Sequence, residues 1–208
     1  MKKYVLLIVS ILMFASLSEG QGQSTCSSPW TTMIEIVSVG GCDYEVELCV
    51  WCAPAYPGEV KVIKFRNAGP CSSTLDQNQI TQGIITQLLN PYSLWFNLCN
   101  NNLPPCKNSP PFIINIDLPI CWKVKLEYQD LQDTTNNVYL SFPCDDDAFC
   151  RIENKYCKDK YGVKHHTEGN YFGFYFPYSC TIEGYNLEMP TVLHAESDCY
   201  ILRTKCNE

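Results

Sequence analysis

Fourteen cysteines constrain the fold of this 208-residue chain more than any other feature. Their number is even, and all of them follow the first twenty residues. An oxidising compartment pairs such cysteines, whereas a reducing one rarely holds so many. The sequence therefore predicts an exported protein without free thiols, in which disulfides use every cysteine: Cys26, Cys42, Cys49, Cys52, Cys71, Cys99, Cys106, Cys121, Cys144, Cys150, Cys157, Cys180, Cys199 and Cys206.

The first twenty residues have the pattern of a secretory signal peptide. Residues 1–3 carry two lysines, residues 4–14 are apolar, and small residues precede the end of the segment at Gly20. An apolar run this short does not span a membrane, and its flanks are those of a signal peptide. We expect cleavage after Gly20 and a secreted protein, extracellular or periplasmic, with no membrane span.

The chain is acidic, with a net charge of −7. Cleavage would remove Lys2, Lys3 and Glu19 and make the protein one unit more negative. A negative surface is poorly attracted to phosphate backbones. A nucleic-acid partner is therefore not expected.

Residues 101–111 are rich in proline and asparagine, a composition typical of a connection. They separate an N-terminal β/α half, residues 21–100, from a C-terminal β-rich half, residues 112–208. The length also permits one domain over residues 21–208.

Residues 42–52 alternate strictly between apolar and charged side chains. In a strand each set shares a face, so one face meets a core and the other meets water. The apolar set is Tyr44, Val46, Leu48 and Val50, and the charged set is Asp43, Glu45 and Glu47. We expect an antiparallel hairpin, with residues 30–39 as the first strand and Gly40 and Gly41 as the turn.

Further strands follow the same reasoning. Residues 59–66 alternate with a change of phase at Val62 and Ile63, which predicts a β-bulge. Beyond the connection, strands are expected at residues 112–118, 122–128, 138–142 and 193–205. The remainder is interpreted as a charged, cysteine-dense segment, a polar loop and a run of aromatics, at residues 144–157, 162–169 and 170–180 respectively.

Residues 75–89 alone have clear helical spacing, with an apolar face formed by Ile80, Ile84, Ile85, Leu88 and Leu89. Ser73 or Thr74 is expected to cap this helix, and Gly83 weakens it by about 1 kcal/mol relative to alanine. Residues 91–100 are expected to add an inward-packed helical turn. The predicted fold is mainly β with one packed helix (α+β), built from disulfide-stapled antiparallel sheets in a sandwich-like arrangement.

Cysteine spacing limits the possible pairings. Seven steps span roughly 23 Å along a strand and roughly 10 Å along a helix, beyond the roughly 7 Å between Cα atoms that a disulfide allows. Cys42 and Cys49 should therefore have different partners, whereas Cys99 and Cys106 can close their own loop. Cys49 and Cys52 have redox-motif spacing, but no helix follows to lower a thiol pKa, so both are interpreted as structural.

Candidate metal ligands are His165, His166, the distant His194 and the acidic residues 145–147. Adjacent histidines of an extended segment point in different directions, and neither the HExxH spacing nor the calcium-loop pattern is present. We interpret them as an exposed loop pair and a solvated turn. No metal and no cofactor is expected.

No GxSxG elbow, P-loop, GxGxxG or kinase signature occurs, and no catalytic residue is assigned. The leading interpretation is a non-catalytic cell-surface or extracellular protein that binds a polysaccharide, another polymer or a protein partner. Two alternatives stay open: a secreted hydrolase acting on glycan or peptide, and a purely structural surface or matrix component.

Residues 171–178 are the expected binding surface. In an extended strand the expected core face holds Phe172, Phe174, Phe176 and Tyr178, and the opposite face holds Tyr171, Gly173, Tyr175 and Pro177. Pro177 favours the edge of a sheet. Tyr171 and Tyr175, roughly 13 Å apart, would then stack sugar rings or anchor a partner protein. The alternative is that both faces are buried.

Overall fold

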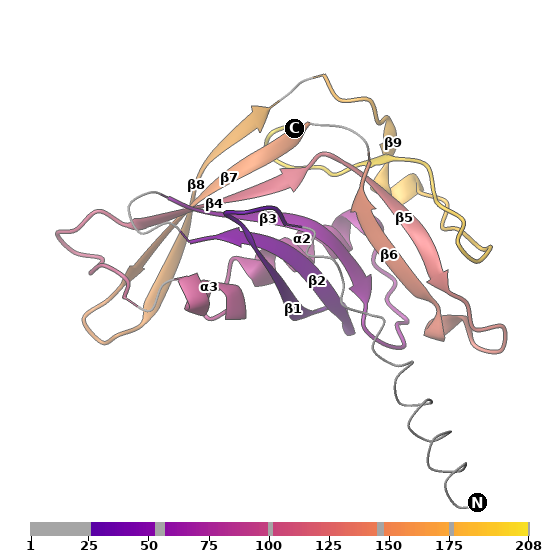
Figure 1. Cartoon of the computed structure of the whole chain (residues 1–208), viewed down its shortest axis with the longest axis horizontal. Helices are drawn as coiled ribbons and strands as arrows, with labels where there is room; N and C mark the ends of the chain where they lie inside the picture. The colour runs from indigo at the N-terminus through magenta and orange to yellow at the C-terminus, as the bar shows by residue number, and fades with distance from the viewer. Residues whose placement is uncertain (1–25, 53–56, 100–101, 145–147, 175–176, 208) are drawn as a thin grey trace, which may run out of the picture.

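The computed structural model describes residues 26–52, 57–99, 102–144, 148–174 and 177–207 (Figure 1). Ten strands form one mixed sheet. Their bounds are β1 Thr31–Val39, β2 Cys42–Trp51, β3 Gly58–Asn67, β4 Phe112–Pro119, β5 Cys121–Tyr128, β6 Val138–Pro143, β7 Phe149–Lys158, β8 Lys164–Phe174, β9 Ile182–Glu183 and β10 Tyr200–Ile201. The helices are α2 Gln77–Leu88 and α3 Leu94–Cys99, with short 3-10 turns η1 Thr134–Asn136 and η2 Gly184–Asn186.

The mainly β architecture with packed helices is confirmed, but the sheet arrangement differs from the expected antiparallel sandwich. The strand order is β8-β7-β4-β3-β6-β5-β10-β9, with β2 and then β1 on the other side of β3. β3 pairs in parallel with β4, and β9 pairs in parallel with β10. No second sheet faces this one within the described residues. Strands from both sides of the proline- and asparagine-rich connection therefore enter the same sheet.

The sheet forks along β3. Its first residues, 58–61, pair with β4, whereas Phe65 and Arg66 pair with β6. Between them Ile63 has no partner in the register with β2, which confirms the predicted bulge. A bulge bends a strand and increases its twist. In Figure 1 the two limbs diverge from β3, with β4, β7 and β8 in one and β6 and β5 in the other.

The β1–β2 hairpin forms as predicted. Val39 lies opposite Cys42, and Gly40 and Gly41 have φ angles of 60° and 81°. A two-residue turn with two positive φ angles matches the twist of the flanking strands, and glycine adopts it without steric cost. The expected apolar set of β2 is buried: Tyr44, Val46, Leu48 and Val50.

Helix α2 lies against β1, but its cap differs from the prediction. Asp76 accepts a hydrogen bond from the Gln79 amide at 2.9 Å, and the Gln79 side chain accepts one from the Asp76 amide. This reciprocal capping box satisfies two amides at the helix start. Ser73 instead accepts a hydrogen bond from Leu75 within the preceding turn. The predicted cap is therefore wrong by two or more residues.

The mid-helix glycine has a packing reason. A Cβ on Gly83 would overlap the side chain of Val39, so the glycine permits close approach of α2 to β1. The expected inward turn is confirmed as α3, where Trp95 and Phe96 are fully buried. Both helices thus cover the same face of the sheet, which we call the inner face.

The cysteine-dense segment, for which no strand was expected, contains β7. Two sequence interpretations of the second half are wrong. The polar loop at residues 162–169 is largely part of β8. β8 is an edge strand without buried residues, so no apolar alternation marks it. The strand expected at residues 193–205 is reduced to β10. Its preceding loop runs along β5, where His194 donates a backbone hydrogen bond to Leu126 at 2.8 Å.

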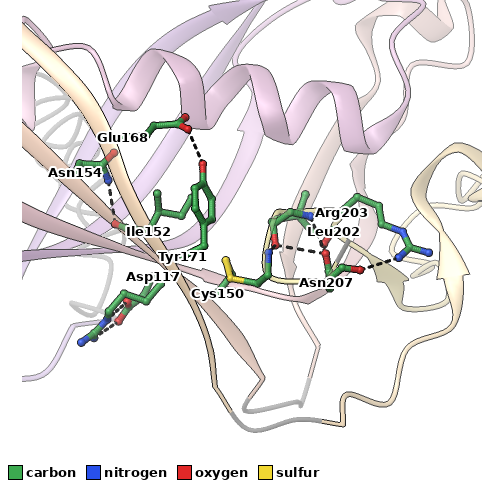
Figure 2. Close-up of a disulfide and its surroundings, with 12 residues drawn as sticks. Asp117, Cys150, Ile152, Asn154, Glu168, Tyr171, Leu202, Arg203 and Asn207 are labelled. Carbon is green, nitrogen blue, oxygen red and sulfur yellow. Dashed lines mark hydrogen bonds and ion pairs between the residues drawn. A yellow bond between two sulfur atoms is a disulfide. The ribbon is translucent and has the colours of Figure 1, made fainter.

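Every cysteine is paired, as predicted. The disulfides are Cys26–Cys49, Cys42–Cys71, Cys52–Cys99, Cys106–Cys157, Cys121–Cys180, Cys144–Cys199 and Cys150–Cys206. Cys42 and Cys49 have different partners, as expected. The loop expected between Cys99 and Cys106 is wrong, because Cys106 joins the connection to the end of β7. Figure 2 shows Cys150 beside the C-terminal residues Leu202, Arg203 and Asn207.

Seven disulfides indicate an oxidising, extracellular-type environment. Cys49 and Cys52 belong to two separate disulfides, in agreement with a structural role. Among the described residues, no helix has the length and apolar character needed to cross a bilayer.

Candidate functional site

The face of the sheet opposite the helices, which we call the outer face, carries an unusual combination of side chains at the fork. Arg151 of β7 lies opposite Asp117 of β4 on one side and Phe172 of β8 on the other. Asp117 in turn lies opposite Lys61 of β3. Because residues opposite each other share a face, β3, β4, β7 and β8 present these side chains together.

Arg151 and Asp117 form a bidentate ion pair. Arg151 Nε donates to Asp117 Oδ1 at 2.7 Å, and Arg151 Nη2 donates to Asp117 Oδ2 at 2.8 Å. Glu59 lies 3.6 Å from the same guanidinium, and Asp117 is almost fully buried. The hydrogen bonds with Asp117 raise the pKa of Arg151 above its usual value. A planar guanidinium held by two carboxylates has a fixed orientation.

Aromatic rings flank this ion pair. The rings of Phe149 and Phe174 stack with centroids 4.7 Å apart and an interplanar angle of 12°. The Arg151 guanidinium carbon lies 5.9 Å and 5.6 Å from the two centroids, within the range of cation–π attraction. Phe174 remains 37% exposed and Phe172 43% exposed. We call Phe149, Phe172, Phe174 and Arg151 the aromatic cluster.

A cavity of about 390 Å³ adjoins the aromatic cluster where β3 changes its neighbour from β4 to β6. This fork pocket has nine lining residues: Lys61, Val62, Ile63, Asp117, Pro119, Pro143, Ala148, Phe149 and Arg151. Its volume is near the lower end of small-ligand sites. The pocket combines apolar walls with the partly buried ion pair of Arg151 and Asp117 and the ammonium group of Lys61. This ammonium group lies 4.4 Å from the Trp30 ring centroid.

The tyrosine surface predicted at residues 171–178 has the opposite orientation to that expected. Tyr171 packs against the core and lies opposite buried Ile152, whereas Phe172 and Phe174 face outward. The prediction of a phenylalanine core face is therefore wrong for Phe172 and Phe174, and Phe176 lies outside the described residues. The register with β7 decides the orientation, and strand alternation alone contains no information on which face is covered. Tyr175 lies outside the described residues.

Tyr171 belongs to a polar group on the inner face. Its hydroxyl donates to Glu168 Oε2 at 2.8 Å (Figure 2), and Lys205 Nζ lies 2.9 Å from the same oxygen. Hydrogen bonds from Lys205 and Tyr171 lower the pKa of Glu168, while burial and then Glu168 raise the pKa of Tyr171. The tyrosine is thus anchored at both its ring and its hydroxyl.

The three histidines do not share a site, although His165 and His166 are neighbours in β8. His165 Nε2 contacts Asp159 Oδ2 at 3.1 Å, and this hydrogen bond lowers the pKa of Asp159. His166 points the other way, to Asn154 Oδ1 at 2.9 Å, and burial lowers its pKa. His194 lies in the loop along β5 with a φ angle of 65°.

Within the described residues, no group of three or more His, Cys, Asp or Glu side chains is arranged to hold a metal ion. The acidic run at residues 145–147 lies outside the described residues.

The sequence analysis overlooked the aromatic cluster, although a signal was present. In the sequence, the charged residues Arg151, Glu153 and Lys155 alternate with Cys150, Ile152, Asn154 and Tyr156, and the structure buries the second set. This alternation predicts a strand with Phe149 and Arg151 on one face. The distance between Asp117 and Arg151 in the sequence gave no indication of their pairing, since it results from the β4–β7 register.

Comparison with protein-family models, with curated proteins and with solved structures gave no match.

Proposed function

We propose that this protein is a secreted, non-catalytic binding protein of the cell surface or extracellular space, and that its partner contacts the outer face at the fork. The observation that carries the proposal is the exposed aromatic cluster at the rim of the fork pocket. Exposed phenylalanine area next to water has no stabilising role in the isolated chain, and such patches favour association.

A protein partner fits this site better than a polysaccharide. Arginine and aromatic side chains are enriched at the centres of protein interfaces and contribute most of their binding energy. Phe172 and Phe174 lack the polar tip that suits tyrosine and tryptophan to the hydroxyl groups of a sugar. The charges around the pocket are nearly balanced, with Lys61 and Arg151 close to Asp117 and Glu59, so the site does not require a strongly charged ligand.

The proposal is tested with the double variant Phe172→Ala/Phe174→Ala. We expect binding to cells or immobilised matrix to fall several-fold, while the free energy of unfolding changes by no more than about 1 kcal/mol. Tyr161→Ala is the matched control, because it also truncates an exposed aromatic ring but lies in the β7–β8 turn. Equal binding by the double variant and the wild type would contradict the proposed site.

The same binding assay, with enzyme-treated cells, separates a protein partner from a polysaccharide, and assays of the purified protein test the hydrolase alternative. Treatment of cells with protease should abolish binding if the partner is a protein, whereas treatment with glycosidases should abolish it if the partner is a polysaccharide. Release of reducing sugar or of peptide by the purified protein would favour the secreted hydrolase. Absence of binding to both untreated cells and immobilised matrix would favour a structural matrix component.

Tyr171 and Tyr175 stay a separate prediction for binding. Because the Tyr171 ring packs on the inner face, Tyr171→Phe is the informative change: it removes the hydroxyl and keeps the packed ring.

A further inference from the structure

Among the described residues, β1 has one neighbouring strand, β2. No described strand pairs with its other side from Ile34 to Ser38. β1 is nine residues long and contains neither proline nor lysine. Natural sheets usually protect such edges with charge, proline, a bulge or a short strand, since an open edge pairs readily with another strand.

The register shows which groups are available. Val39 and Cys42 flank the two-residue turn, so they exchange hydrogen bonds, and odd-numbered residues of β1 face β2 in the same way. Ile34, Ile36 and Ser38 therefore direct their N–H and C=O groups away from β2. The same residues place their side chains on the outer face, where Ile34 is 52% and Ile36 57% exposed.

The surroundings of this edge are apolar. The only titratable side chain in β1 is Glu35, and it turns inward to accept hydrogen bonds from the α3 amides of Leu94 at 2.9 Å and Trp95 at 3.4 Å. Leu94 and Leu98 lie one turn apart on α3 and are both more than half exposed. Apolar side chains thus occur on both sides of the open edge.

The opposite edge of the sheet, β8, is protected. It contains Lys164, His165, His166 and Glu168, and its pairing with β7 is interrupted by a register shift. A charged and bulged edge is a poor template for a further strand. Head-to-tail growth from β1 of one copy to β8 of the next is therefore disfavoured.

We propose that β1 pairs with β1 of a second copy of this chain, in antiparallel orientation, to form a two-fold symmetric dimer with a continuous sheet. Antiparallel self-pairing is closed, because both copies use the same edge. The pairing covers Ile34 and Ile36 and satisfies the outward backbone groups.

The side chains select a register centred on Ile36. This register places Ile36 opposite Ile36 of the second copy, Glu35 opposite Val37, and Met33 opposite Val39. A register centred on Glu35 would place two carboxylates directly opposite each other, which is unfavourable. The Ile36 register avoids that contact, pairs Ile36 with Ile36 on the outer face and Met33 with Val39 on the inner face, and places Ile34 opposite Ser38.

The test uses charge exchange at the symmetry axis. The purified protein, with its disulfides intact, is expected to sediment as a dimer that dissociates on dilution. Ile36→Lys and Ile36→Glu should each weaken dimerisation by about tenfold or more, because like charges then face each other across the axis. An equimolar mixture of the two variants should restore the dimer, because lysine then faces glutamate.

Leu131→Lys is the matched control, because Leu131 is, like Ile36, an exposed aliphatic side chain but lies in the β5–β6 connection. This variant should remain dimeric. A monomeric wild type, a dimer insensitive to both Ile36 variants, or a mixture that stays monomeric would each overturn the proposal. If the variants fail to fold, amide exchange in the wild type decides. Protection of the Ile34 and Ile36 amides supports the paired edge, and rapid exchange of both overturns it.

Discussion

The edge strands β1 and β8 are of similar length, yet β1 holds three buried side chains and β8 holds none. The difference arises from the inner face. Helices α2 and α3 cover β1, whereas the inner side of β8 has Tyr171, His166 and the ion pair of Glu168 with Lys205. Alternation therefore predicts the orientation of a strand only where another element covers one of its faces.

The same two strands also separate side chains that stabilise the fold from side chains of the two proposed interaction surfaces. In β1 the inward residues hold the fold together, and the exposed isoleucines are available for the proposed dimer. In β8 the outward Phe172 and Phe174 contribute to the aromatic cluster, and ion pairs replace apolar burial on the other side. Surface ion pairs contribute little to stability, so β8 should be the less stable edge of the sheet.

The largest expected effect compares one aromatic side chain from each region. Trp95→Ala should lower the free energy of unfolding by about 3–5 kcal/mol, because it removes a fully buried ring beneath β1. Phe174→Ala should lower it by no more than about 1 kcal/mol, because the ring is already partly exposed. Urea unfolding with the disulfides intact measures both. Similar losses of stability for the two variants would show that Phe174 of the aromatic cluster stabilises the fold as strongly as the buried Trp95.

A smaller effect is expected for two glycines that approach a neighbour closely. Gly83→Ala should destabilise by about 1–2 kcal/mol, because overlap with Val39 outweighs the helix propensity gained. Gly169→Ala should destabilise by less, about 1 kcal/mol or below, because the nearest atom belongs to the Glu153 carboxylate, which can move, and the Glu153 carbonyl oxygen at 3.1 Å requires only a small shift. Gln87→Ala on the exposed side of α2 is the control for helix propensity. A stabilised Gly83→Ala variant would mean that α2 can move away from β1 at little cost.

The smallest expected effects are changes in the free energy of unfolding with pH. They have opposite signs for Glu35 in β1 and His166 in β8. Burial raises the pKa of Glu35, so its contribution to stability is present at low pH and is lost as the pH rises through the raised value. Burial lowers the pKa of His166, so its contribution is present above about 6.5 and is lost as the pH falls through the lowered value.

These signs are measured as differences between the wild type and single variants. On acidification below neutral pH, the wild type should gain stability relative to Glu35→Gln and lose stability relative to His166→Gln. Thermal unfolding of all three proteins across this range gives both differences, and the titration of other carboxylates cancels. Differences of the same sign would show that the two edges do not respond to protonation as their surroundings predict.

Much of the local structure could be predicted because it depends on neighbours in the sequence. The hairpin followed from the alternation in β2 and from Gly40 and Gly41, and the bulge followed from the phase change at Val62 and Ile63. The helix followed from its apolar spacing, but its cap did not, since Ser73, Thr74 and Asp76 all have capping side chains and only backbone geometry selects Asp76.

Periodicity and redox chemistry were enough to predict a mainly β chain with paired cysteines, because neither depends on contacts between distant residues. Long-range packing sets the fork in the sheet, the partner of each cysteine and the contact of Arg151 with Asp117. It also decided that Tyr171 turns inward while Phe172 turns outward. The physical reason is that strand registers are set by long-range pairing, and a shift of one residue exchanges the two faces of a strand.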